Sequence, residues 1–160
     1  MAPALLTLTL MSVLAIAASL GLAFLAQTSA EVARHVLLGV FGTFLNLLAH
    51  SLMIFYLLGK GKAVKEAVTE NGLTGDYAAR ITRLRAPVFS RATTAMAVTM
   101  VTAIVGASVD VGVLSSWPHS TLAAAALVSN LAAIAAEISA LRGSASIVDE
   151  VNRLLLGSNG

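Results

Sequence analysis

Four long apolar stretches, separated by short polar links, dominate the hydropathy pattern of this chain. None of the four contains Asp, Glu, Lys or Arg, and crossing the core of a bilayer takes about 20 such residues. The stretches are residues 2–30, 35–59, 92–109 and 111–136, and residues 86–90 extend the third. The pattern predicts an all-α membrane protein, a bundle of four transmembrane helices at about residues 4–27, 33–59, 88–113 and 119–142.

Composition supports this prediction. The chain is 58% hydrophobic and only 11% charged, whereas soluble domains carry about 25% charged residues. No Lys or Arg precedes the first stretch, and the stretch is longer than the ~7–15 apolar residues of a signal peptide. We therefore expect it to be a transmembrane helix and not a cleaved signal.

The charged residues predict an orientation. Seven bases lie between the second and third apolar stretches, against only three acids. Because positively charged links stay in the cytoplasm, residues 60–87 are predicted to form a cytoplasmic loop. Four crossings then place both the N- and the C-terminus in the cytoplasm, with the chain multi-pass in a bacterial-type inner (plasma) membrane. A net charge of only +2 makes nucleic-acid binding a poor interpretation, and the lipid bilayer is the expected partner.

Within the cytoplasmic loop, residues 61–70 are predicted to continue the second helix into water, the two glycines of residues 71–76 to break it, and a short amphipathic helix to follow. Tyr77, Ile81 and Leu84 recur on one face, as in a helix that lies along an apolar surface. Three bases project from the other face, where anionic lipid headgroups could bind them. These headgroup candidates are Arg80, Arg83 and Arg85.

A second short amphipathic helix is predicted in the C-terminal tail, residues 144–160, which follows the transmembrane domain of residues 1–143. Its apolar stripe consists of Ile147, Val151, Leu154 and Leu155. An isolated helix of this length is marginal in water, so we expect another segment or a partner protein to cover the stripe.

Polar side chains within the apolar stretches are the first candidates for a functional site, because polar groups at membrane depth are rare. Asn46 and His50 lie one turn apart on one helix, and Asn130 and Glu137 share a face of another. They are predicted to form one buried polar cluster if these helices are neighbours. The cluster would hold helices together through hydrogen bonds of about 0.6 kcal/mol each, or line a proton or ion path.

Two histidines suggest a different chemistry. His35 and His119 lie at the outer starts of the second and fourth helices, at equal depth. Two facing imidazoles at one depth are what haem b needs as axial ligands. His50 lies roughly 20 Å deeper than His35 at the α-helical rise, so it could serve only as a lone ligand to another porphyrin-type pigment.

The sequence lacks the motifs of an enzyme. There is no cysteine, which excludes thiolate chemistry, and we find no paired acids, nucleophile–base arrangement or metal-ion cluster. This favours a non-catalytic integral inner-membrane protein, a subunit or scaffold of a homo- or hetero-oligomeric membrane complex that needs no cofactor. Two alternatives stay open. One is a small homo-oligomeric channel or transporter with the polar cluster at its centre, and the other is a haem- or quinone-associated electron-transfer anchor that uses His35 and His119.

Overall fold

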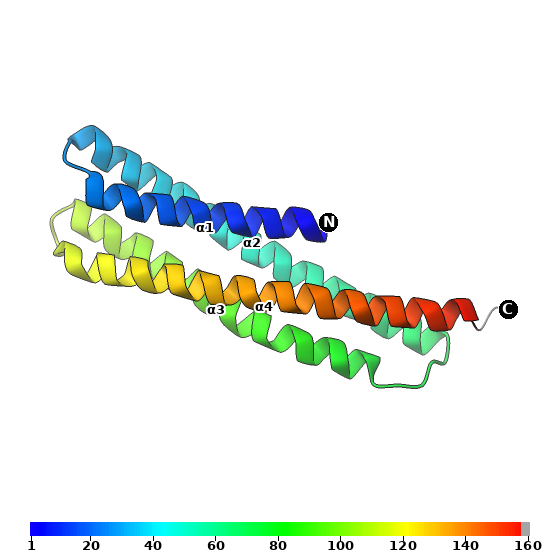
Figure 1. Cartoon of the computed structure of the whole chain (residues 1–160). Coiled ribbons are helices and arrows are strands. Elements are labelled where there is room, and N and C mark those ends of the chain that lie inside the picture. Colours follow the sequence, from blue (N-terminus) through cyan, green and yellow to red (C-terminus); the bar gives the residue numbers. More distant parts are fainter. Residues whose placement is uncertain (158–160) are drawn as a thin grey trace.

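The computed structural model describes residues 1–157, and all four of their regular elements are α-helices joined by short links. Consecutive helices run antiparallel, so that α1 and α2 form one hairpin and α3 and α4 form another (Figure 1). The helices are α1 (Ala2–Leu25), α2 (Ser29–Glu70), α3 (Tyr77–Asp110) and α4 (Ser116–Gly157). The predicted four-helix bundle is therefore confirmed.

Around the bundle, α2 and α4 both contact α1 and α3, and they also touch each other across the centre. Helices α1 and α3 lie on opposite sides of this central pair and make no contact within the described residues. Small residues permit the close approaches. A Cβ atom on Gly42 of α2 would lie only 3.3 Å from the backbone nitrogen of Ile16 on α1. This arrangement places the inward faces of α2 and α4 side by side, where the predicted polar cluster lies.

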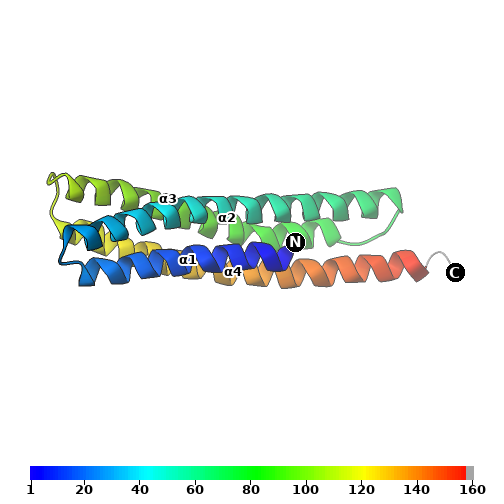
Figure 2. The ribbon, with the colours of Figure 1, turned by 90° about the horizontal axis from the view of Figure 1, so that it is seen from above.

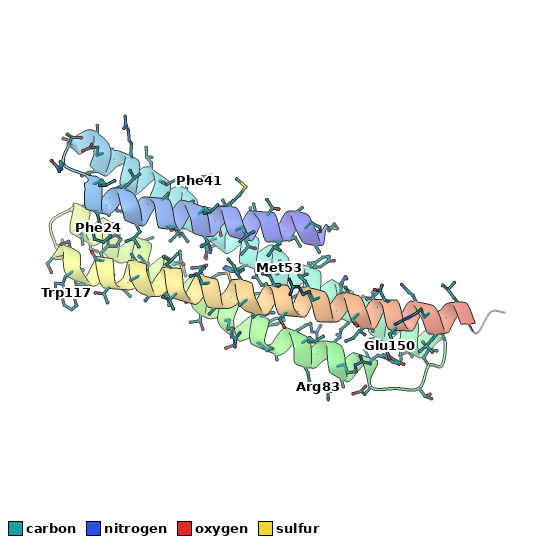
Figure 3. The ribbon with its side chains drawn as sticks, viewed as in Figure 1. Phe24, Phe41, Met53, Arg83, Trp117 and Glu150 are labelled. Carbon is teal, nitrogen blue, oxygen red and sulfur yellow. The ribbon has the colours of Figure 1, made fainter. Side chains whose placement is uncertain are left out.

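All four helices are long enough and apolar enough to cross a membrane. Helix α1 has 24 residues, which span about 36 Å at the α-helical rise. Large apolar side chains cover the outside of the bundle, such as Phe41 with 57% of its surface exposed, whereas Met53 is completely buried (Figure 3). Apolar side chains on both the inside and the outside of the bundle are typical of a multi-pass membrane protein.

Beyond the N-terminus of α1, the other three helices continue as a three-helix extension (Figures 1 and 2). Its core is a separate apolar cluster formed by Val64, Tyr77, Ile81, Ile147 and Val151. The extension and its boundary with the four-helix part hold every Lys and Arg of the chain except Arg34. The molecule thus consists of an apolar four-helix part and a charged three-helix extension.

The extension corrects the prediction of separate short amphipathic helices. Helix α2 runs on to Glu70 and the chain breaks at residues 71–76, as predicted, but α3 then runs from Tyr77 to Asp110 as one helix, without a separate short helix before the transmembrane part. Helix α4 likewise passes Gly143 without a break. A Cβ atom there would lie 2.7 Å from Cδ1 of Leu84, so this glycine serves close packing of α3 against α4 and does not end the helix.

The extension also answers what covers the apolar stripe of the tail. Ile147 and Val151 are buried against α2 and α3 of the same chain. Leu154 remains 44% exposed. Because the chain covers most of its own stripe, the tail no longer indicates a partner protein.

At the opposite end, the link between α1 and α2 has a well-defined geometry. The hydroxyl of Thr28 accepts a hydrogen bond from the backbone amide of Glu31, and the Glu31 carboxylate accepts from the amides of Gln27 and Thr28. This capping box satisfies amides at the start of the helix that would otherwise lack partners. It begins α2 at Ser29, about 1.7 turns before His35, and so defines the place of that side chain along the bundle.

Candidate functional site

The four predicted cluster residues come together between α2 and α4. Asn46 and His50 of α2 meet Asn130 and Glu137 of α4, and all four residues have 0% of their surface exposed. We call this group the inner polar cluster. Its members are in direct hydrogen-bond contact, as the prediction of neighbouring helices required.

Asn130 is the centre of the inner polar cluster, and its partners determine its orientation. Its Nδ2 group donates to the backbone carbonyl of Ala126 at 2.8 Å and to the hydroxyl of Thr99 on α3 at 3.0 Å. Its Oδ1 atom therefore faces α2 and accepts from Nδ2 of Asn46 and from Nε2 of His50, the latter at 2.9 Å. Since a carbonyl oxygen only accepts, Nε2 of His50 carries a proton.

The second nitrogen of His50 faces a carboxyl group. Nδ1 of His50 and Oε1 of Glu137 are 2.6 Å apart, and both side chains are fully buried. One proton lies between these two atoms, either on the imidazole or on the carboxyl. In both cases the pair has no net charge, which is the condition for burying two ionisable groups at low cost.

Two further members of the inner polar cluster come from α1 and α3; of these, Ser12 was not predicted from the sequence. Ser12 of α1 accepts a hydrogen bond from Nδ2 of Asn46 at 3.4 Å, and Thr99 of α3 accepts from Asn130. The cluster therefore joins all four helices. The pattern that could have revealed Ser12 is the recurrence of Thr9, Ser12 and Ser19 on one face of α1, where all three are buried.

Within the described residues, two buried acceptors of the cluster have no hydrogen-bond partner. They are Oδ1 of Asn46 and Oε2 of Glu137. Leaving a buried acceptor unpaired costs about 1–3 kcal/mol.

The other two histidines lie together at the link end of the bundle, the end that carries residues 26–28 and 111–115. The ring centroids of His35 and His119 are 5.9 Å apart, and the ring planes are inclined by 74°. Neither histidine contacts the inner polar cluster; His35 precedes His50 by 15 residues, or about 22 Å along α2. The prediction that they share one depth holds, and the fold also makes them neighbours.

Backbone carbonyls define the tautomer of both rings. Nδ1 of His35 lies 2.8 Å from the carbonyl oxygen of Ser19, and Nδ1 of His119 lies 3.1 Å from that of Thr102. A carbonyl oxygen only accepts, so each Nδ1 donates a proton. In the neutral rings each Nε2 then carries a lone pair, and neither Nε2 has a hydrogen-bond partner among residues 1–157.

Both imidazoles line a cavity of about 470 Å³ at the link end. This volume lies in the range of ligand sites, about 300–1,000 Å³. All four helices contribute to its mostly apolar wall, and its polar part includes a carboxylate of the α3–α4 hairpin, Asp110. Helix α3 also links the cavity to the inner polar cluster, because Thr99 lines the first and bonds to the second. We call this space, with its two histidines, the outer cavity.

The outer cavity suits one type of metal centre. No group of three or more His, Cys, Asp or Glu side chains that could hold a bare metal ion occurs in the described part of the chain. Two imidazoles suffice when a macrocycle supplies the other four ligands.

The three arginines predicted to bind lipid headgroups lie in the first turns of α3. Arg80 forms an ion pair with Glu150 of α4 at 2.9 Å, and Arg83 pairs with Asp76 at 2.7 Å (the labelled Arg83 and Glu150 are in Figure 3). Arg85 lies against the backbone of α2 at Gly61. Two of the three charges thus already have acidic partners within the chain, and lipid binding stays a prediction.

No family model, characterised protein or solved structure matches this chain. Its function must therefore be inferred from the inner polar cluster and the outer cavity themselves.

Proposed function

We propose that this chain is a multi-pass membrane protein that holds one haem in the outer cavity, between His35 and His119. The observation that carries the proposal is the pair of unpartnered Nε2 atoms on neighbouring rings, each with its Nδ1–H donated to a backbone carbonyl. Histidines that bind metals characteristically donate their other ring N–H in this way.

The same tautomers argue against a quinone. A quinone oxygen accepts hydrogen bonds, but the two available Nε2 atoms are themselves acceptors in the neutral rings. They fit an electron-poor partner such as a metal ion. A haem held by His35 and His119 would supply electron transfer. The chain's part in this is to orient both imidazoles and to enclose the group in an apolar wall.

The inner polar cluster gives weaker support to the channel or transporter alternative. A conducting path needs a polar route on both sides of the cluster. Toward the extension, the cluster is followed by an apolar core that fills the centre of the bundle. This core consists of Met53, Leu57, Val88, Ala92, Ala136 and Ala140. We therefore assign the cluster a structural role, that of joining the four helices in one register.

The proposal also includes the prediction that this chain is a subunit of a larger membrane complex. A single haem has to receive its electron from one redox partner and deliver it to another, and other subunits of a membrane complex would supply these partners. The basic excess of the extension favours a cytoplasmic location for it and for both termini, in a bacterial-type inner membrane. The outer cavity would then open toward the opposite side.

Haem titration tests the central proposal. The protein would be purified from haem-replete cells into lipid nanodiscs, and hemin would be added to any remaining apoprotein. We expect one haem per chain with a low-spin, six-coordinate spectrum. His35→Ala and His119→Ala should each abolish the low-spin spectrum, whereas His50→Leu should retain it and serves as the matched control. Absence of haem uptake by the wild type, or unchanged spectra in both outer variants, would overturn the proposal.

Orientation and partners have separate tests. The chain has no cysteine, so single cysteines at Ser115 and Ser146 report on the two ends without a background signal. A membrane-impermeant maleimide added to intact cells should label Ser115→Cys only, and labelling of Ser146→Cys alone would invert the proposed orientation. Native mass spectrometry after gentle extraction should find other polypeptides in fixed stoichiometry; a ring of this chain alone would favour the channel.

A further inference from the structure

We propose that Gly106 of α3 is a positioning residue of the outer cavity, whose missing side chain lets the His119 ring take the orientation that haem ligation needs. This inference deepens the proposed function, and its link to haem rests on it. The two observations behind it are independent of any cofactor: a steric one at Gly106 and a hydrogen bond at Thr102.

Two residues one turn apart on α3 face the Nδ1–Cε1 edge of the His119 ring. The carbonyl oxygen of Thr102 accepts the proton of Nδ1 at 3.1 Å. Four residues later, Gly106 faces the same ring. A Cβ atom built on Gly106 would lie 2.7 Å from Cε1, 3.0 Å from Nδ1 and 3.4 Å from Nε2 of His119. The hydrogen-bonded ring and an alanine methyl at position 106 therefore cannot occupy the same space.

Backbone conformation does not explain this glycine. Gly106 lies inside α3 and is absent from the glycines with positive φ, which are Gly72, Gly75 and Gly112. Alanine is the better residue at an ordinary helical position. The glycine is thus unfavourable for the helix alone, and the contact with His119 is what the structure offers as its reason.

The partner histidine has a milder version of the same arrangement. A Cβ atom on Gly39 would approach the hydroxyl oxygen of Ser19 to 3.0 Å. This hydroxyl donates to the backbone carbonyl of His35, and a hydroxyl can rotate away, whereas the ring of His119 is rigid. We therefore expect a smaller effect from Gly39→Ala than from Gly106→Ala.

The experiment compares Gly106→Ala with Gly21→Ala, a matched control in α1 whose added Cβ would have no neighbour within 4 Å. In nanodiscs, Gly106→Ala should lower haem affinity at least tenfold and replace the low-spin spectrum by the five-coordinate spectrum of ligation by His35 alone. The control should bind haem like the wild type. A low-spin spectrum and unchanged affinity in Gly106→Ala would overturn the inference.

A second readout needs no haem. Nitrogen NMR of histidine labelled in the ring reports which nitrogen is protonated, and His119→Ala identifies the signal. The wild-type ring should show a protonated Nδ1 and an unprotonated Nε2, and Gly106→Ala should shift both signals. If the signals shift but the wild type binds no haem, positioning by Gly106 stands and the proposed haem site fails. Signals that stay in place would overturn positioning itself.

A double-mutant cycle keeps the inference testable if Gly106→Ala folds poorly. In a His119→Ala background the ring is gone, so the methyl group at position 106 has room. We expect Gly106→Ala to lower the Tm in the wild type and to leave it unchanged, or raise it, in the His119→Ala background. An equal Tm loss in both backgrounds would show that the methyl group clashes with something other than His119, and would overturn the inference.

Discussion

The inner polar cluster and the outer cavity use the same side chain, an imidazole, in opposite ways. His50 has both ring nitrogens in hydrogen bonds, no exposed surface and a carboxyl partner from the facing helix. His35 and His119 each have only Nδ1 in hydrogen bonds and leave Nε2 unpartnered beside a cavity of about 470 Å³.

This difference indicates which of the three histidines are available to bind a ligand. A ring with both nitrogens satisfied would have to lose a hydrogen bond before it could bind a metal, and a buried group left unpaired costs about 1–3 kcal/mol. A ring with one nitrogen held by a carbonyl is already oriented for ligation. The inner polar cluster should therefore contribute stability, and the outer cavity should contribute binding.

The largest expected effect on stability comes from Glu137→Ala. It leaves Nδ1 of His50 buried without a partner, at a cost of about 1–3 kcal/mol, and truncation of a fully buried side chain adds a cavity, for a total of about 3–5 kcal/mol. Unfolding free energy in mixed micelles should fall by that amount. Glu137→Gln is the matched control, because its amide can still donate to Nδ1 and should cost only about 1 kcal/mol. A comparable loss in Glu137→Gln would show that the pair is an ion pair and not a neutral one.

His50→Leu should have a smaller effect on stability. It leaves Oε1 of Glu137 without its partner, while Oδ1 of Asn130 keeps its hydrogen bond from Asn46. One unpaired buried group predicts a loss of about 1–3 kcal/mol, measured by the same unfolding titration. The variant should still assemble. Unaltered stability would mean that the cluster contributes nothing to the fold. The assignment of stability to the inner polar cluster and binding to the outer cavity would then be wrong.

His119→Ala should affect stability less than the two variants of the inner polar cluster, and haem binding more. The single hydrogen bond of its ring to the Thr102 carbonyl predicts a stability loss of only about 0.5–1.5 kcal/mol in the haem-free protein. Its haem affinity should nevertheless fall at least tenfold, measured by hemin titration. A stability loss as large as that of Glu137→Ala would show that the outer histidines are structural as well.

The smallest expected effect on stability is that of an ion pair in the three-helix extension. Arg80 and Glu150 form an ion pair 2.9 Å long whose side chains are each 36% exposed, and such exposed pairs contribute about 0.2–1 kcal/mol. A double-mutant cycle with Arg80→Ala and Glu150→Ala should give a coupling energy in this range that falls as salt increases. A coupling that does not respond to salt would indicate a more buried pair than the structure contains.

Depth along the bundle could be predicted from the sequence alone. Counting residues at the constant rise of a helix places Asn46 beside Asn130 and His35 level with His119, and both levels occur in the structure. The apolar pattern likewise identified four helices. It divided α3 and α4 at the extension into transmembrane and short amphipathic helices, whereas both run on without a break and Gly143 packs closely against Leu84.

Which helix faces meet around the bundle axis could not be predicted in this way. The helical period states which residues share a face, but not which face of another helix meets them, and that choice depends on the packing of all four helices together. Only the tertiary structure decided that Thr99 and Ser12 complete the inner polar cluster. It also decided which nitrogen of each histidine carries the proton, because the deciding acceptors are carbonyl oxygens of Ser19, Thr102 and Asn130. Sequence determined the levels of the polar groups, and packing determined their partners.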